Sequence, residues 1–183
     1  MLNAHAPSLI AAAILLGVLT LYAGLRVAGR LRETHGNVMR RWMIGGTVIL
    51  GIGAGITDLI ARAALLEAPR VPVEPGWLAA AALTAQVSAW ALLRTLGEVR
   101  QTGARLFHRS LACGATWALM HELLVVATGS HPTLATDPWM QHGLRFAVTT
   151  LAVTASLHCA FRLLDELTPS EIVRPLGTAC LLA

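Results

Sequence analysis

The chain has 183 residues, of which 55% are hydrophobic and 13% are charged, and its formal net charge is +4. So few charges cannot cover the surface of an ordinary soluble domain, in which about a quarter of the residues are charged. The positive balance does not indicate a nucleic-acid partner, because the 14 basic residues, all of them Arg, are loop residues between apolar stretches. The composition therefore predicts an all-α, polytopic integral membrane protein.

Five apolar segments follow one another along the chain, each long enough to cross a bilayer. The predicted spans are residues 8–29, 41–65, 76–96, 107–129 and 143–164. The last ten residues, "RPLGTACLLA", are apolar but too short to cross a membrane, so they predict at most a partial sixth helix. We therefore expect a single transmembrane domain over residues 1–183.

Arg residues are unevenly distributed between the two sets of connecting segments. Eleven lie at or near the loops after the first and third spans and in the C-terminal segment, and three lie on the opposite side. Loops rich in Lys and Arg remain on the cytoplasmic side of the membrane. We therefore expect a bacterial inner-membrane protein with its N-terminus outside and its Arg-rich loops in the cytoplasm.

The chain also repeats itself in units of one helix pair. The segments "TLYAGLR", "SAWALLR" and "SLHCAFR" recur at one constant interval, and each has a small hydroxyl residue six positions before an Arg. Gly51, Gly114 and Gly177, in the even-numbered helices, recur at a second constant interval. This pattern predicts a pseudo-symmetric bundle of tandem helix pairs. The repeat units are residues 8–65, 76–129 and 143–183.

Ionisable side chains inside the apolar segments are the clearest candidates for a site. When the sequence is shifted by the distance from Gly51 to Gly114, the segment "GITDLIARAA" aligns with "ALMHELLVVA". Asp58 then occupies the position of His121. Arg62 lies one helical turn beyond Asp58, where the two side chains can pair. Glu122 adjoins His121, about 100° round the helix. Because charged groups inside membranes generally neutralise one another, we expect these four side chains to form a polar cluster.

The glycine spacing and the Arg placement resemble those of the MHYT domain family, a bacterial integral membrane sensor module. The segment "GRLRETHGNVMRRWMIGGTVILGIGAGI" is similar to that family's first inner loop and second helix, and the resemblance covers most of the chain. It implies three helix pairs, each with a Met-His-Tyr-Thr-Gly-Met-like motif near the outer membrane face. In that family the His and Met residues are proposed to bind copper, which such ligands suit, and to sense a diatomic gas.

The family motif is eroded in this sequence. At the first copy, which contains Asp58 and Arg62, neither Met nor His is present, and the third copy would begin at Ala183. The resemblance therefore implies a metal site only at Met120 and His121. The eroded motif favours a structural ion-pair network over metal binding. Proton handling at His121 and contact with another subunit are the remaining interpretations.

Other histidines offer further candidate sites. His158 lies in the fifth predicted span, where a single His could contact haem or chlorophyll, although a hydrogen bond to a neighbouring helix is the simpler interpretation. His131, Met140 and His142 are expected in the outer loop "SHPTLATDPWMQH". They could capture a metal ion there, but solvated side chains are the simpler interpretation.

The sequence contains no Ser-His-Asp set and no phosphate-binding loop, so we expect no catalysis. An odd number of spans leaves half of the third repeat without a partner. The first hypothesis is therefore an accessory or structural subunit of a larger respiratory or photosynthetic complex, in contact with the lipid bilayer and with other membrane subunits. The alternative hypothesis is a copper-binding membrane sensor of diatomic gases or of redox state.

Overall fold

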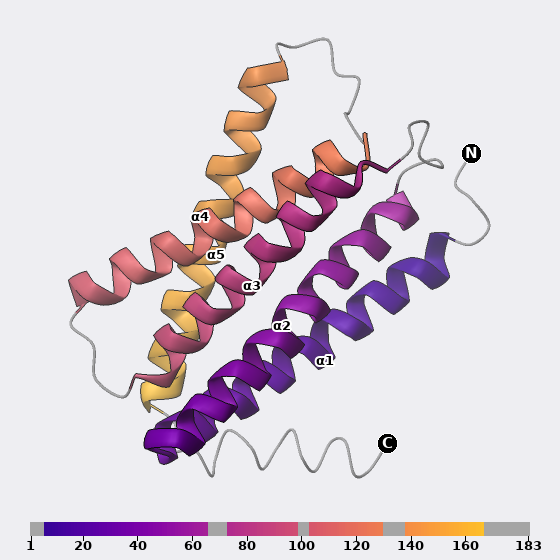
Figure 1. The fold of residues 1–183 in the computed structure, drawn as a ribbon. Helices are drawn as coiled ribbons and strands as arrows, with labels where there is room; N and C mark the ends of the chain where they lie inside the picture. Colours follow the sequence, from indigo (N-terminus) through magenta and orange to yellow (C-terminus); the bar gives the residue numbers. More distant parts are fainter. Residues whose placement is uncertain (1–5, 66–72, 99–102, 130–137, 167–183) are drawn as a thin grey trace.

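Five helices make up the part of the chain that the computed structural model describes, residues 6–65, 73–98, 103–129 and 138–166 (Figure 1). They are α1 Ala6–Glu33, α2 Gly36–Leu65, α3 Pro75–Gly97, α4 Gly103–Ala127 and α5 Pro138–Glu166. These described residues contain no strand, in agreement with the predicted all-α class. The predicted partial sixth helix and His131 lie outside them.

Most of the helices are longer than the predicted spans. The turn between α1 and α2 ends at Gly36, whose φ of +63° lies in the left-handed region that favours glycine, and α2 begins there. Its first turns include Arg40 and Arg41, which lie at or before the start of the predicted span. Hydropathy marks only the apolar part of a helix, whereas Arg is itself a good helix former. The Arg-rich ends are therefore helical although they are polar.

Four of the helices are long and apolar enough to cross a membrane, and they are Pro7–Glu33, Gly36–Ala64, Pro75–Gly97 and Gly103–Ala127. Their outer faces carry large apolar side chains, such as Ile14 at 62% exposure and Leu83 at 70%, as lipid contact requires. α5 is not among the four within the described residues. These four helices indicate that the chain is a membrane protein. The predicted count of five spans stays a prediction.

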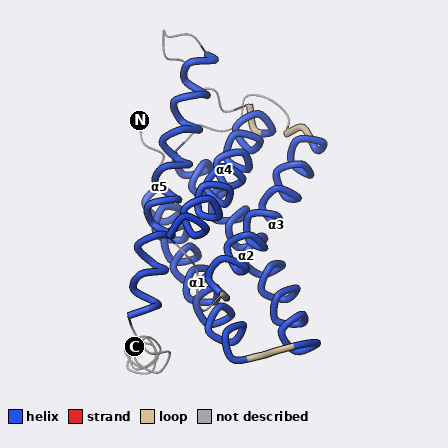
Figure 2. Tube along the Cα trace, turned by 90° about the vertical axis from the view of Figure 1, so that its left-hand side faces the viewer, coloured by secondary structure: helices blue, strands red, loops and turns tan. Residues whose placement is uncertain are grey.

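Helices that are neighbours in the sequence pack against each other, and α1 also contacts α3. Figure 1 shows α1 to α4 side by side in alternating directions, whereas α5 crosses α4. The view turned by 90° shows α5 along one edge of the bundle (Figure 2). Among the described helices, α4 is the main packing partner of α5. The position of α5 therefore depends on its contact with α4.

Glycines in α2 allow close contacts with α1 and α3. A Cβ atom on Gly46 would lie 2.5 Å from Cγ1 of Val27 and 2.9 Å from Cδ1 of Leu93, so the three helices meet at this position. A Cβ atom on Gly53 would lie 2.5 Å from Oγ1 of Thr20 in α1. Small residues let helix backbones approach closely, which matters in lipid because no hydrophobic force drives the helices together. Close backbone packing therefore holds this part of the bundle.

Two repeat-equivalent glycines make equivalent contacts with the following helix. A Cβ atom on Gly51 would lie 2.5 Å from Nε2 of Gln86 in α3, and one on Gly114 would lie 2.9 Å from Oγ1 of Thr154 in α5. Gln86 and Thr154 are themselves separated by the repeat interval of the odd-numbered helices. These contacts agree with a helix-pair repeat, which stays a prediction.

Candidate functional site

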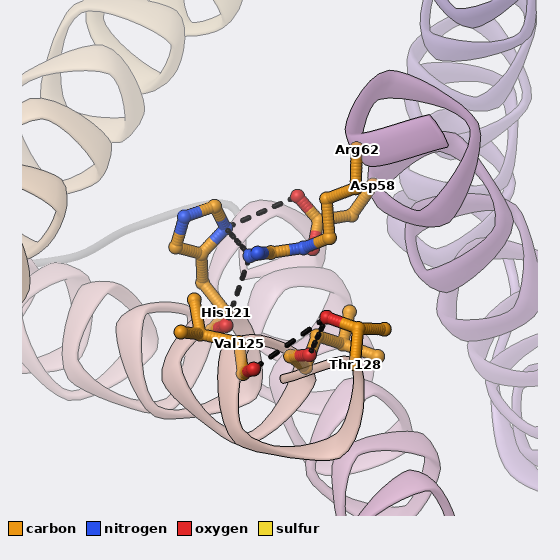
Figure 3. A network of polar contacts seen from close by, with 6 residues as sticks. Asp58, Arg62, His121, Val125 and Thr128 are labelled. Atoms are coloured by element: carbon orange, nitrogen blue, oxygen red, sulfur yellow. Dashed lines mark hydrogen bonds and ion pairs between the residues drawn. The ribbon is translucent and has the colours of Figure 1, made fainter. Parts of the chain in front are cut away.

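The centre of the candidate site is a polar network of Asp58 and Arg62 from α2 with His121 from α4 (Figure 3). Nε of Arg62 donates to Oδ2 of Asp58 over 2.9 Å, and its Nη2 donates to the backbone oxygen of His121 over 3.0 Å. Nδ1 of His121 lies 3.1 Å from Oδ1 of Asp58 and 3.1 Å from Nη2 of Arg62. The structure thus brings together three of the four residues in the predicted polar cluster.

The helices explain why these three side chains meet. Asp58 and Arg62 are one helical turn apart, so they lie on the same face of α2. α2 and α4 run in the same direction, and Figure 1 shows their ends on the same side of the bundle. Nδ1 of His121 lies 3.1 Å from Oδ1 of Asp58, so the two residues lie at similar depth, as the predicted repeat implies. Their side chains join two helices that are not neighbours in the sequence.

The network lies in largely apolar surroundings. The side chain of Arg62 is 11% exposed and that of Asp58 is 17% exposed, whereas His121 is 35% exposed. An unpaired charge at such a position is unfavourable, so each ion depends on the other. One carboxylate balances one guanidinium, and the network is neutral as long as His121 is neutral. A proton on His121 would therefore add one positive charge to a balanced pair.

Neutral His121 has two hydrogen-bonding arrangements in this network. With the proton on Nδ1, the ring donates to Oδ1 of Asp58, and with the proton on Nε2, Nδ1 accepts from Arg62. The two neighbours of Nδ1 compete, because one is an acceptor and the other is a donor. When both ring nitrogens are protonated, Nδ1 can only donate to Asp58, and a second cation then lies beside Arg62. Protonation therefore leaves a single arrangement.

The second ring nitrogen of His121 points away from Asp58 and Arg62 (Figure 3). A histidine whose Nδ1–H is held by a carboxylate is a common metal ligand through Nε2. Within the described ranges, however, no three His, Cys, Asp or Glu side chains gather as a metal site would require. Met120, the other predicted ligand, is 1% exposed and packs with Ala81, Ala85 and Leu124. The described residues thus do not fit a copper site of the kind that the family resemblance implies.

Glu122 does not join the Asp58–Arg62–His121 network, contrary to the sequence prediction. It faces α5, where its Oε2 contacts Nδ1 of His142 and its Oε1 lies 3.9 Å from Nε of Arg145. Successive residues of a helix point about 100° apart, so Glu122 and His121 face different neighbours. Oε1 of Glu122 is buried and has no hydrogen-bond partner among the described residues. A second polar contact thus lies next to the first one along α4.

The Glu122–His142 contact was missed because residues 130–142 were expected to form a loop. In the structure α5 begins at Pro138, which places Met140 and His142 in its first turns. Met140 is 63% exposed, and His131 lies outside the described residues, so the described residues do not bring together the three side chains that were considered for metal capture. Pro138 was the available signal, because Pro is favoured at the first position of a helix.

His158 lies apart from both contacts. It is half-buried in α5, and its position in the sequence puts it about 24 Å along the helix from His142. It has no hydrogen-bond partner among the described side chains, so the predicted bond to a neighbouring helix is not seen there. The predicted contact with haem or chlorophyll through this single His stays a prediction.

Replacing Glu122 with Gln should loosen the start of α5. The change removes the charge that faces His142 and Arg145, and loss of one partner of a buried polar contact costs about 1–3 kcal/mol. We expect faster hydrogen exchange in the first turns of α5, measured by mass spectrometry on detergent-solubilised protein. Glu33→Gln is the matched control, because the Glu33–Arg30 pair is more than half exposed and should contribute about 0–1 kcal/mol. Equal exchange in both variants would contradict the proposed anchoring.

The fold and the polar network define a membrane protein of apolar helices with ionisable groups between them. A comparison of sequences adds a similarity to one known enzyme. The chain is 26% identical over 164 residues to the bifunctional diguanylate cyclase/cyclic di-GMP phosphodiesterase MucR of Pseudomonas aeruginosa. The match covers 89% of this chain but 24% of that protein, so the chain spans about a quarter of its length. No family model matches the chain, and no solved structure matches it. The chain is thus similar to part of one such enzyme, and the resemblance to the MHYT family stays a prediction.

Proposed function

We propose that the chain is a non-catalytic membrane sensor module that receives its signal at the Asp58–Arg62–His121 network. The observation that carries the proposal is the set of ionisable side chains between α2 and α4, within 3.1 Å of one another and within apolar helices. Ionisable groups in a membrane are costly to keep, and they commonly mark functional positions. The similarity to a signalling enzyme supports a sensory role.

The proposed signal is the protonation of His121. Histidine is the side chain whose charge ordinarily changes between about pH 5 and 8. The charged groups that face His121 are Asp58 and Arg62 of α2, and a proton on the ring gives the network a net positive charge. The added charge strengthens the contact with Asp58 but repels Arg62, and the net charge of the network is unfavourable in apolar surroundings. Protonation therefore favours a different position of α2 relative to α4.

The proposed signal leaves the network through α5. Glu122, the residue after His121 in α4, contacts His142 and lies near Arg145, both in α5. A rotation or shift of α4 at His121 would move Glu122 as well. Because α4 is the main packing partner of α5 among the described helices, α5 would follow that movement. We also propose that the module lies in the bacterial inner membrane with its Arg-rich loops in the cytoplasm.

The sequence also suggested an accessory subunit and a copper-based sensor. The comparison gives no support to an accessory subunit, because the matched protein is a signalling enzyme. Copper-based sensing of a diatomic gas or of redox state is the alternative that the family resemblance implies, but the described residues bring no ligand set together for it. Stoichiometric copper in the purified full-length chain, lost in His121→Ala, would establish the alternative in place of proton sensing.

A chimera tests the sensor function. This chain replaces the matched region of MucR, and cyclic di-GMP is measured in cells at external pH 5.5 and 8. We expect a pH-dependent level of cyclic di-GMP, because protonation of His121 changes the position of α4. Asp58→Asn should change that level and flatten its pH dependence, since the protonated ring loses the negative charge that faces it.

His108→Gln is the matched control for the chimera, because His108 is exposed at the start of α4 and bonds only to a backbone oxygen of its own helix. It should leave both the level of cyclic di-GMP and its pH dependence unchanged. The sensor proposal fails if the chimera gives the same pH-independent level with and without the Asp58→Asn change.

A further inference from the structure

An open groove of about 500 Å³ runs along the start of α2, away from the Asp58–Arg62–His121 network. Its walls include Met43, Ile44 and Val48 of α2 and the indole of Trp90 from α3. It extends from Gly36 to Val48, which is about 18 Å along a helix. One leaflet of a bilayer has a hydrocarbon depth of about 15 Å. The groove thus has the length and the lining that suit a single acyl chain.

The end of the groove near the start of α2 is positively charged. Arg40 lines it, and the guanidinium of Arg94 lies 5.0 Å from the centre of the Trp90 ring that forms its other wall. Neither Arg has a carboxylate partner among the described residues, in contrast to Arg30, which pairs with Glu33. In the described part of the chain, no acidic side chain lines the groove. Two unneutralised cations therefore stand beside an apolar groove.

Thr47 is a polar residue in the apolar lining of the groove. Its hydroxyl is buried and has no hydrogen-bond partner among the described residues, although the residue lines the groove. Thr57 of the same helix donates to the carbonyl oxygen of Gly53 over 2.7 Å, whereas Thr150 of α5 has a hydroxyl that is unpaired within the described residues, as Thr47 has. A buried hydroxyl without a partner is unfavourable.

We propose that this groove binds an anionic phospholipid. An acyl chain lies against Met43, Ile44 and Val48, and the phosphate pairs with Arg40 beside the Arg94–Trp90 stack. Basic pockets between transmembrane helices are known to hold anionic headgroups. A zwitterionic lipid offers the same acyl chain but carries its own cation, which Arg40 and Arg94 repel. The lipid packs on α2 and α3, so it would influence the helix that carries Asp58 without touching the network.

Spin-label spectroscopy tests the lipid site. The full chain is reconstituted in phosphatidylcholine vesicles that contain a trace of spin-labelled phosphatidylglycerol or spin-labelled phosphatidylcholine. The fraction of motionally restricted label gives the preference of the protein for each lipid. We expect a preference of about fivefold for phosphatidylglycerol, which corresponds to about 1 kcal/mol for one Arg near an anionic headgroup. Arg40→Gln should abolish it.

Arg41→Gln is the matched control, because Arg41 is exposed at the same depth of α2 but does not line the groove. It should keep the preference. An equal loss in both variants would show diffuse attraction to a basic surface, and a preference that survives Arg40→Gln would place the lipid elsewhere. Either result overturns the proposal. A third result would also overturn the proposal. If analytical ultracentrifugation finds a dimer, and Ile44→Trp dissociates it, the groove holds a second copy of the chain and not a lipid.

Discussion

Replacing Asp58 with Leu should lower the free energy of unfolding by about 3–5 kcal/mol, because it leaves a buried guanidinium without its counter-ion. Arg62 is 11% exposed, and Asp58 is its carboxylate partner at 2.9 Å. His121 cannot replace the lost charge, since a neutral ring offers a single lone pair and a protonated ring repels Arg62. The loss is measured by equilibrium unfolding of the purified chain in mixed detergent micelles.

The double variant Asp58→Leu/Arg62→Leu separates the charge effect from the loss of packing. With both charges removed, no ion is left unpaired, and replacement of a buried ion pair by apolar residues is often neutral for stability. We expect the double variant to regain most of the stability that the single variant loses. A single variant that loses less than about 1 kcal/mol would instead indicate that water solvates the network, as it does an exposed pair.

This comparison also separates a structural role from a sensory one. If the network only held α2 and α4 together, the double variant would fold and its hydrogen exchange would show the pH dependence of the wild-type chain. If the network receives the signal, the double variant should fold but lose that pH dependence, because His121 then has no charged neighbour. Stability and pH response thus report on different properties of the same three residues.

The apolar helices could be predicted from composition alone, whereas their ends could not. Residues 41–65 were predicted as a span and α2 begins at Gly36, because a helix continues through Arg-rich turns that hydropathy does not detect. The start of α5 was missed for a different reason. The residues just before the predicted span, Gln141 and His142, are polar and are typical of a loop, although they are helical in the structure.

The candidate site was predictable where the repeat relates its residues. Asp58 and His121 are equivalent positions of the repeat and belong to parallel helices, so the pattern predicts that they lie at one depth. The partner of Glu122 could not be predicted in this way. It depends on which neighbour each face of α4 meets, and this is set by the crossing of α5 over α4. Periodicity along one helix carries no information on that crossing.

Replacing Gly114 with Ala should separate α4 from α5. A Cβ atom there would lie 2.6 Å from the backbone oxygen of Thr150 and 2.9 Å from Oγ1 of Thr154. The first of these atoms belongs to the backbone, so the contact can be relieved only by moving the helix. Overpacking of this kind typically costs about 1–3 kcal/mol. Because α4 is the main packing partner of α5 among the described helices, we expect the cost to appear as faster hydrogen exchange throughout α5.

Gly45→Ala is the matched control for this prediction, because a Cβ atom on Gly45 would meet nothing within 4 Å. Ala is favoured over Gly within a helix by about 1 kcal/mol, so this variant should be neutral or more stable than the wild-type chain. The two substitutions are chemically identical and share the same gain in helix propensity, so their stabilities should differ by the overpacking cost of about 1–3 kcal/mol. A difference near zero would show that α5 shifts over α4 without cost. The Glu122–His142 contact could then not fix the position of α5, and α5 could not carry a signal from His121.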